Sequence, residues 1–354
     1  MQRLRNQWVV LLFSMTVMGF LLSCGGGDGT SDGESPRTST YLGTQNPGDV
    51  WSWTIAMDGS TGSFNATNET LGYDYAGDVD TLPNDFLRLT VTSTTEPGMS
   101  IPAVAYAVEV PDTALIVKPD GDDPVVVCAA QGACPTLDAA YNWVPLVDST
   151  FDLASDTGYG VTDATISGSD FAFDSQFYLL DGSANGTESV TGFSCSSGRL
   201  TRTGDPMTIG VTPSGMLIGD EGPGAGGFVG MQAPDASIDL DDLLAHGREF
   251  RGVVIKARIG GDESEAVWAR ADGLGGFVGG HYDDFEAGIE DSETTDITFN
   301  AQPSPGVFNA TQTEASGSSS LVIMVSRIDG RYVIYGAGAG APHMVAENFL
   351  VMEQ

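Results

Sequence analysis

Short apolar runs bounded by turn-forming residues recur along most of the chain, and they predict β-strands. The clearest runs are rich in β-branched or aromatic residues and end at Gly, Pro, Asp or Ser; they cover residues 86–92, 103–110, 321–328 and 331–335. Asp58-Gly59 follows another such run, and Asp329-Gly330 separates the last two. The second pair is the strongest hairpin signal, because both central residues of a type I′ turn need a positive φ.

Only one stretch has a helical pattern. Asp239 can cap residues 240–246, and Gly247 can end this helix after about two turns. Closely spaced strands with so little helix predict an all-β fold of the antiparallel sandwich or barrel type.

Composition divides the chain into a leader, a linker and a body. Residues 1–23 form the leader, and residues 24–40 are mostly Gly, Ser, Asp, Thr and Pro, which predicts a flexible linker. The remaining residues are enough for two domains or one large β unit. A change of strand pattern near residues 203–207 predicts an N-terminal β domain over 41–203 and a C-terminal β domain over 204–354.

Two short self-similarities occur without a common period. Residues 64–67 recur as 308–311, and residues 226–230 recur as 275–279. Because the two spacings differ, no single repeat length links them. Chance or shared strand chemistry explains them more simply than a duplicated β unit.

The N-terminus has the features of a secretory signal in their usual order. Arg3 and Arg5 precede a mostly apolar stretch over residues 8–22, and a small residue, Ser23, follows it. At ~1.5 Å per residue the stretch spans about 22 Å, less than the ~30 Å hydrocarbon core of a bilayer. A cleaved signal is therefore favoured over a permanent transmembrane helix.

The string Leu21-Leu22-Ser23-Cys24 resembles the lipobox of bacterial lipoproteins. The resemblance implies that the thiol of Cys24 receives a diacylglycerol and that the chain is cut just before it. Two or more acyl chains anchor stably, because burial contributes roughly 0.8 kcal/mol per CH₂. In Gram-negative lipoproteins an aspartate directly after the cysteine commonly signals inner-membrane retention, but here the residue is Gly25.

Lipid anchoring at the outer membrane is therefore expected, with the body periplasmic or surface-exposed. The alternative is an ordinary cleaved signal with an unmodified Cys24.

The charge of the chain excludes one class of partner. There are 48 acidic and 14 basic side chains, so the formal net charge is −34. Sequence-independent binding to the phosphates of nucleic acid needs clustered Lys and Arg, and the only lysines of the chain are Lys118 and Lys256. No nucleic acid partner is expected. With 41% apolar residues, the body can still bury a core.

Three cysteines remain in the body. Export implies an oxidising compartment, so Cys128 and Cys134, which are close in sequence, are predicted to form a disulfide. Cys195 is then a buried thiol. The alternative is a bridge from Cys195 to either of the other two.

Common catalytic motifs are incomplete. Residues 192–196 lack the final glycine of a nucleophile elbow, and the glycine run at 222–227 does not lead into a helix. His246, His281 and His343 share no metal-ligand spacing.

The densest titratable cluster contains Asp283, Asp284 and Glu286. Paired carboxylates can hydrolyse glycosides when they lie about 5 to 9 Å apart across a cleft. Neighbours on a strand point to opposite faces, so a solvated acidic loop explains the cluster more simply.

Calcium is the natural cation for so many carboxylates. Residues 120–123 depart from the EF-hand pattern, whereas residues 239–242 and the acidic run over 262–296 could hold Ca²⁺ loosely. The alternative is an acidic, solvated surface. No cofactor is predicted apart from such loosely held Ca²⁺.

Four aromatic residues alternate on two predicted strands: Trp51, Trp53, Tyr73 and Tyr75. Each pair shares one sheet face, as in a core or in a sugar-stacking platform, and core packing is the simpler interpretation.

These observations favour an outer-membrane lipoprotein that serves as a non-enzymatic binding or structural module of the cell envelope, with a protein or glycan partner. One alternative is an anchored polysaccharide hydrolase that uses Asp283, Asp284 or Glu286. The other is a calcium-dependent adhesion module.

Overall fold

Antiparallel strands form nearly all of the regular structure in the computed structural model, which confirms the predicted all-β fold. The residues that it describes are 35–45, 48–120, 124–146, 158–167, 170–179, 181–212, 214–222, 226–258, 261–273, 275–290, 295–314, 317–328, 330–338 and 344–354. Their strands form three sheets, and each sheet closes on itself as an up-and-down barrel.

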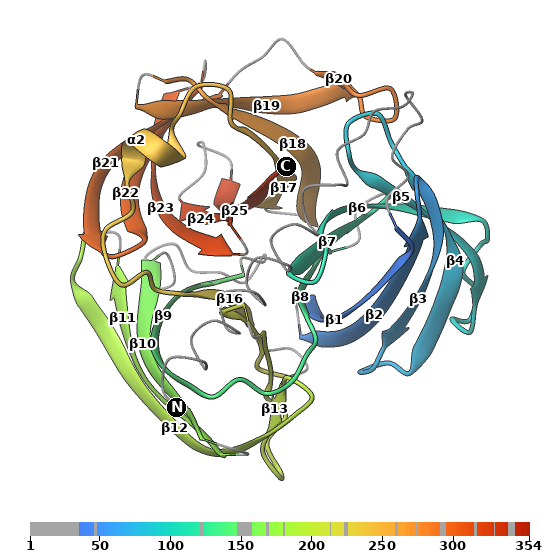
Figure 1. Cartoon of the computed structure of the whole chain (residues 1–354), viewed down its shortest axis with the longest axis horizontal. Helices are drawn as coiled ribbons and strands as arrows, with labels where there is room; N and C mark the ends of the chain where they lie inside the picture. Colours follow the sequence, from blue (N-terminus) through green and yellow to red (C-terminus); the bar gives the residue numbers. More distant parts are fainter. Residues whose placement is uncertain are drawn as a thin grey trace, which may run out of the picture. The chain divides into compact units, whose positions relative to one another are not determined.

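Barrel 1 is built from the first eight strands, blue to green in Figure 1, and closes where β1 pairs with β8. The strands are β1 (Arg37–Gln45), β2 (Asp49–Asp58), β3 (Thr61–Asn68), β4 (Tyr73–Thr81), β5 (Leu87–Thr94), β6 (Ala103–Val110), β7 (Ala114–Pro119) and β8 (Val126–Ala130). Since β1 begins at Arg37, residues 37–40 belong to a strand and not to the predicted linker. Asp58 pairs with Thr61, so the β2–β3 hairpin turns at Gly59 and Ser60, one residue later than predicted.

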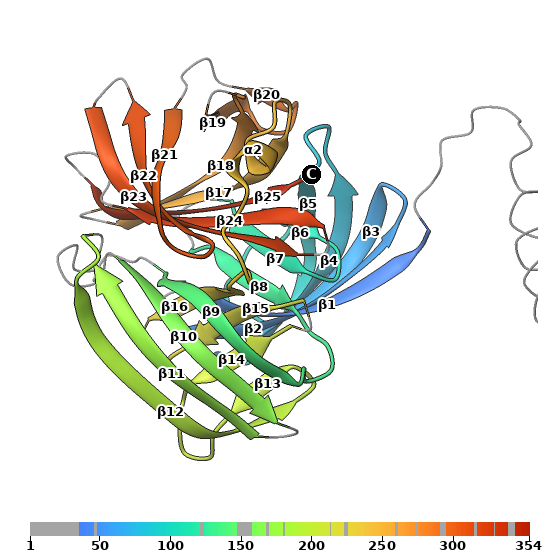
Figure 2. The ribbon, with the colours of Figure 1, turned by 60° about the vertical axis from the view of Figure 1, so that its left-hand side comes forward.

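Barrel 2 is built from the next eight strands and closes where β9 pairs with both β10 and β16 (Figure 2). The strands are β9 (Leu137–Pro145), β10 (Gly158–Ser167), β11 (Asp170–Leu179), β12 (Ala184–Ser196), β13 (Arg199–Thr201), β14 (Thr208–Val211), β15 (Met216–Asp220) and β16 (Gly227–Gln232).

Barrel 3 follows a short helix, α2 (Leu240–Leu243), and closes where β18 pairs with β19. The strands are β17 (Glu249–Arg258), β18 (Gly261–Ala271), β19 (Gly276–Asp284), β20 (Ile289–Glu290), β21 (Thr295–Ser304), β22 (Val307–Glu314), β23 (Gly317–Ile328), β24 (Arg331–Gly338) and β25 (Met344–Glu353). The two-residue β20 pairs only with β19 and lies outside the ring.

The predicted helix and the strongest predicted hairpin both lie in this last third of the chain. The Asp239 side chain accepts a hydrogen bond from the Asp241 N–H at 3.0 Å, as expected of a cap, although the helix ends after one turn. Ile328 pairs with Arg331, as the Asp329-Gly330 hairpin requires, and Gly330 has a φ of 84°.

Several strands are buried on both faces, which explains their continuous apolar sequences. In β8, Val126 and Cys128 face the core of barrel 1, while Val127 joins a second buried cluster. That second cluster, the junction core, is the largest and draws residues from all three barrels, such as Ile116, Ile218 and Val333. The outer faces of the barrels thus share one core, and the body behaves as one compact unit over Ser35–Gln354.

Buried polar contacts also connect the barrels. Thr44 in barrel 1 donates a hydrogen bond of 2.8 Å to the buried Asp220 in barrel 2. Asn84 in barrel 1 donates to the carbonyl oxygen of Phe285 in barrel 3 at 2.9 Å. Loss of either contact leaves a buried polar group without its partner.

The barrels divide the chain at other positions than the predicted domain boundary. Positions 203 and 204 lie between β13 and β14, and Thr201 pairs with Thr208 across them within barrel 2. The sheets instead change at residues 131–136 and 233–248. The β units of the structure are therefore three closed barrels, not the segments 41–203 and 204–354.

The disulfide joins Cys134 to Cys195, so the predicted bridge between Cys128 and Cys134 is wrong. Cys128 is a buried free thiol inside barrel 1. Cys134 lies in the connection to barrel 2, which passes beside the β12–β13 turn: a Cβ on Gly198 would lie 3.1 Å from the carbonyl oxygen of Gly132. The close contact between these two segments places Cys134 against Cys195. Distance along the sequence, on which the predicted bridge was based, does not show this contact.

Candidate ligand-binding site

Each barrel contains a cavity that is lined by tryptophan. The cavity volumes are about 280 Å³ in barrel 1, 30 Å³ in barrel 2 and 70 Å³ in barrel 3. Trp51 and Trp53 line the first, Trp143 the second and Trp268 the third. An eight-stranded barrel can be filled by its own side chains or can hold one small ligand. The volume and the lining of each cavity show which of the two applies.

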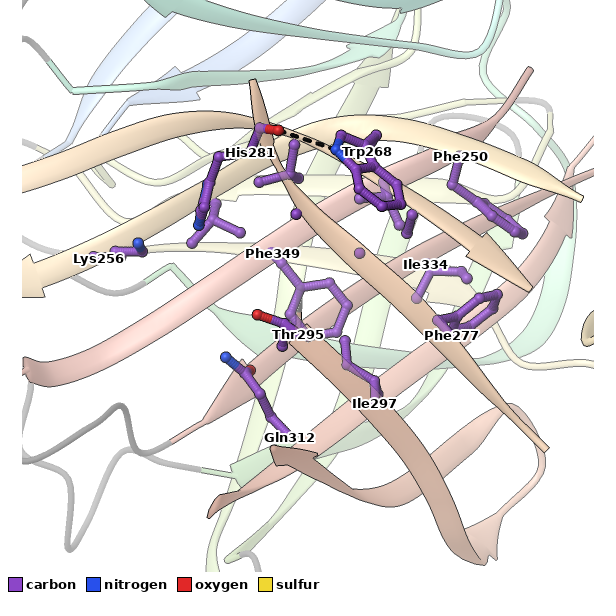
Figure 3. A pocket seen from close by; sticks show the side chains of 16 residues that line it. Phe250, Lys256, Trp268, Phe277, His281, Thr295, Ile297, Gln312, Ile334 and Phe349 are labelled. Carbon is purple, nitrogen blue, oxygen red and sulfur yellow. Dashed lines mark hydrogen bonds between the residues drawn. The ribbon is translucent and has the colours of Figure 1, made fainter. Parts of the chain in front are cut away.

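The cavity of barrel 3 is small and mainly apolar, and Phe277 and Phe349 are among its walls (Figure 3). The Trp268 indole donates a hydrogen bond of 3.0 Å to the carbonyl oxygen of His281. At the polar edge, Lys256 Nζ and His281 Nδ1 lie 2.5 and 3.0 Å from the same Glu265 oxygen. Small-molecule sites usually enclose ~300 Å³ or more, so this space fits a gap in a packed core better than a ligand site.

The cavity of barrel 2 has room for about one water molecule. Its polar groups are engaged with one another, because Trp143 Nε1 and Thr162 Oγ1 each donate to Ser175 Oγ at 2.9 Å. Burial raises the pKa of the Glu221 carboxyl, and the negative charges of Glu188 and Asp220 raise it further. This cavity is a polar part of the barrel core.

The cavity of barrel 1 opens at one end of the barrel and has an aromatic wall. Its lining residues come from the ends of β1, β3, β5 and β7 and from the starts of β2, β4, β6 and β8, which meet at one mouth. Phe64, Trp53, Trp51 and Tyr75 form a continuous row of rings along it, the aromatic row. Successive ring centroids are 5.9, 5.7 and 5.4 Å apart, so the row runs from the core to the mouth.

Small side chains face the aromatic row across the barrel. In a ring of eight strands, β6 lies four strands from β2 and is therefore opposite to it. β6 contributes Ala103 and Ala105 to the lining, whereas β2 contributes Trp51 and Trp53. This pairing of large with small side chains leaves the space that forms the cavity.

Hydrogen bonds fix the outer rings of the row. Trp51 Nε1 donates to Gln45 Oε1 at 2.6 Å, and Gln45 Nε2 donates to the carbonyl oxygen of Pro124 at 3.1 Å. The Tyr75 hydroxyl donates to Glu96 Oε2 at 2.8 Å. These bonds hold the rings in place before any ligand arrives, which lowers the entropic cost of binding.

One polar group in the row lacks a partner. Trp53 is 6% exposed, and its indole N–H has no hydrogen-bond acceptor among the described residues. A buried donor without a partner is costly, so an acceptor supplied from the cavity would be favourable.

The opposite end of barrel 1 is closed by a buried polar group. The Tyr41 hydroxyl donates to Glu109 Oε1 at 2.5 Å, and Arg37 donates to the same oxygen at 2.8 Å. Burial raises the pKa of Tyr41 well above its usual value, and the Glu109 charge raises it further. The barrel is thus open at the aromatic mouth and filled at this end.

The carboxylates that the sequence singled out for glycoside hydrolysis do not form a described pair. Glu286 accepts a hydrogen bond of 3.0 Å from the Tyr106 hydroxyl and lies 3.5 Å from Arg88 Nε. It therefore joins barrel 3 to barrel 1. Asp283 and Asp284 are the last residues of β19, and their side chains lie outside the described part of the structure.

The acidic segments proposed for calcium form no group of three or more potential metal ligands within the described residues. Asp239 caps α2, and Asp242 is paired with Arg248 at 2.7 Å. Asp120 lines the mouth of barrel 1, whereas residues 121–123 lie outside the described part.

The other predicted site residues are dispersed. His281 lines the barrel 3 cavity and His246 is exposed after α2, while His343 and Cys24 lie outside the described residues. Of the aromatic residues singled out in the sequence, Trp51, Trp53 and Tyr75 line the barrel 1 cavity. Core packing, the simpler interpretation of their alternation, therefore does not fully explain their position. Sequence reasoning missed Glu96 and Ala105, because Glu96 reaches the mouth through its hydrogen bond with Tyr75 and Ala105 faces the aromatic row only once the barrel closes.

The chain gives no match to known protein families or to curated proteins. Within the described residues, no helix has the length and apolar character needed to cross a bilayer.

Proposed function

We propose that the chain is a lipid-anchored binding protein of the outer membrane that takes up a small molecule in the mouth of barrel 1. The anchor is the acylated Cys24 that the lipobox implies. The observation that supports binding is the cavity of about 280 Å³ with one aromatic and one small-residue wall. Its size is near the lower end of small-molecule sites, which are typically lined by apolar and aromatic side chains with a few polar groups.

The other two functions have weaker support. A hydrolase would need a carboxylate pair across a cleft, and Glu286 is already engaged with Tyr106 and Arg88. A calcium-dependent module would need a cluster of oxygen ligands, for which the acidic segments remain the only argument. Of the three functions, small-molecule binding therefore has the strongest structural support.

Native mass spectrometry of the full chain, extracted from membranes in detergent, tests the binding function. We expect the protein to retain a small molecule and the Ala105→Trp variant, whose new ring fills the cavity, to lose it. Ala269→Trp, which fills the barrel 3 cavity, is the matched control and should retain the molecule. Equal retention by the Ala105→Trp variant, or no bound molecule on the unaltered chain, would contradict the proposal.

Membrane fractionation tests the anchor separately. The unaltered chain should appear in the outer-membrane fraction with the added mass of a lipid, and Cys24→Ser should abolish both properties. A Cys24→Ser protein that fractionates with the outer membrane unchanged would exclude anchoring through this residue.

A further inference from the structure

We infer that the mouth of barrel 1 is built for an organic cation, an ammonium group with apolar substituents and a nearby hydrogen-bond acceptor. This inference rests on the proposed function, because it names the class of ligand for the same cavity. The observations that favour it are the charge of the lining, the aromatic row and the partnerless indole of Trp53.

The described lining carries negative charge. Asp49, Glu96 and Asp120 line the cavity, and no Lys, Arg or His is among its described residues. Asp49 accepts a hydrogen bond of 2.8 Å from Asn68, and Glu96 accepts one from Tyr75, so both carboxylates are held at the mouth by neutral donors. A cation that enters the cavity would gain a favourable electrostatic interaction, whereas an anion would be repelled.

The aromatic row suits the same ligand. A cation over the face of Trp or Tyr is attracted by the ring quadrupole, and recognition of substituted ammonium groups by aromatic side chains is the best-known use of this effect. Trp51 and Tyr75 are only half-buried, so their rings are accessible at the mouth. Their ring centroids are 5.4 Å apart with a 32° angle between planes, so the two rings pack against each other at the mouth.

The polar side chains of the mouth explain why a neutral polyol fits less well. A sugar needs several donors and acceptors that are free to turn toward it. Gln45 already bonds to Trp51 and the Pro124 carbonyl, and Asn68 bonds to Asp49 and to the backbone N–H of Leu71. These amides hold the walls in place, and the described lining offers a sugar mostly carboxylate acceptors.

The indole of Trp53 defines the remaining part of the ligand. Because its N–H has no acceptor among the described residues, an oxygen placed against this ring would remove the cost of a buried donor. The complementary ligand therefore has an oxygen atom a few bonds from its cationic nitrogen.

Titration calorimetry with three probes tests this inference on the detergent-solubilised full chain. The probes are choline, its neutral isostere 3,3-dimethylbutan-1-ol, and glucose. We expect choline to bind at least tenfold more tightly than the isostere and glucose not to bind. Glu96→Gln and Asp120→Asn should each weaken choline binding several-fold and leave the isostere unchanged, and Trp51→Ala should weaken both ligands.

Glu188→Gln, which changes a carboxylate at the barrel 2 cavity, is the matched control and should bind choline like the unaltered chain. Because Trp51→Ala could unfold barrel 1, the cation inference is judged on Glu96→Gln and Asp120→Asn. Near-UV circular dichroism checks that these two variants are folded. Equal affinity for choline and its isostere would overturn the cation inference but leave the proposed function standing. Glucose binding that is lost in Trp51→Ala would do the same. Failure of all three probes, together with no molecule retained in native mass spectrometry, would overturn both.

Discussion

Gly43 in β1 lies directly opposite Cys128 in β8, and the sulfur of Cys128 occupies the space that a side chain at position 43 would need. The pair sits at the seam where barrel 1 closes. It explains both why the thiol is buried and why a glycine is present in the middle of a strand, where glycine otherwise weakens the structure. A thiol that is packed over the neighbouring strand in this way cannot also reach Cys134.

This contact predicts the effect of a single methyl group. We expect Gly43→Ala to lower the free energy of unfolding by about 1–3 kcal/mol, because the core has no room for it. Cys128→Ala in the same chain should restore part of the loss, although the Val127 carbonyl oxygen, which would lie 3.1 Å from the new methyl group, limits the recovery. Guanidinium unfolding of the two single variants and the double variant measures the coupling, and simple additivity would contradict the packing explanation.

The disulfide between Cys134 and Cys195 predicts a second stability effect. It closes a loop over a sequence separation of 61 residues, for which chain entropy gives a stabilisation of about 4 kcal/mol. The double variant Cys134→Ser/Cys195→Ser should therefore unfold at lower denaturant concentration, and reductant should shift the unaltered chain but not this variant. Cys128→Ser keeps the bridge and should stay sensitive to reductant. A bridge involving Cys128 in peptide mapping would contradict the assignment.

Two buried tyrosines predict opposite results for the same substitution. The Tyr41 hydroxyl donates to the buried Glu109, whereas the Tyr335 hydroxyl has no partner among the described residues. Tyr41→Phe leaves a carboxylate with one donor fewer and should cost about 1–3 kcal/mol. Tyr335→Phe removes an unsatisfied hydroxyl from the junction core and should be neutral or stabilising. Thermal unfolding of both variants checks this, and an equal loss would show that the Tyr335 hydroxyl has a partner.

Local features of this fold could be predicted from the sequence because they depend on neighbouring residues. Asp239 as a cap and the hairpin between Ile328 and Arg331 are examples. The number of barrels could not be predicted from the sequence, because the closure of a barrel depends on pairing between distant strands such as β1 and β8. Strands at the junction core are also buried on both faces, which removes the alternation that would show how each barrel faces its neighbours.

The candidate site shows the same limit. Trp51 and Tyr75 stand out by their alternation, but whether they face a core or a cavity depends on the residues opposite. Ala103 and Ala105 supply that space, and nothing in their own segment indicates that they lie across a barrel from two tryptophans. Likewise, Glu96 becomes part of the mouth only through its bond with Tyr75.

The tyrosines also predict how stability depends on pH. Burial raises the pKa of Tyr41, Tyr141 and Tyr335 above the ordinary value in the folded chain. Above about pH 10 the unfolded chain therefore loses these protons while the folded chain keeps them, so fewer protons are bound on unfolding and stability falls as pH rises. The stabilisation is complete below the unfolded pKa and is lost progressively above it, by about 1.4 kcal/mol per tyrosine for each pH unit.

Lysines titrate in the same pH range as tyrosines. The chain has only two of them, so they contribute little to the change of stability with pH. Between pH 10 and 11 the three tyrosines together should remove about 3 kcal/mol from the free energy of unfolding, because each is already half ionised at pH 10 in the unfolded chain. Denaturant unfolding at several pH values measures the slope. Tyr335→Phe should lower the loss between pH 10 and 11 by about 1 kcal/mol, because that group no longer titrates in the unfolded chain. Cys128, Tyr106, Tyr282 and Tyr332, whose pKa values burial also raises, maintain the rest of the slope. Chloride salts at fixed pH provide the control, since screening acts on surface charge and leaves the proton balance of buried groups nearly unchanged. A slope that stays the same in Tyr335→Phe would mean that this hydroxyl ionises equally in the folded and unfolded chains, which its complete burial in the junction core argues against.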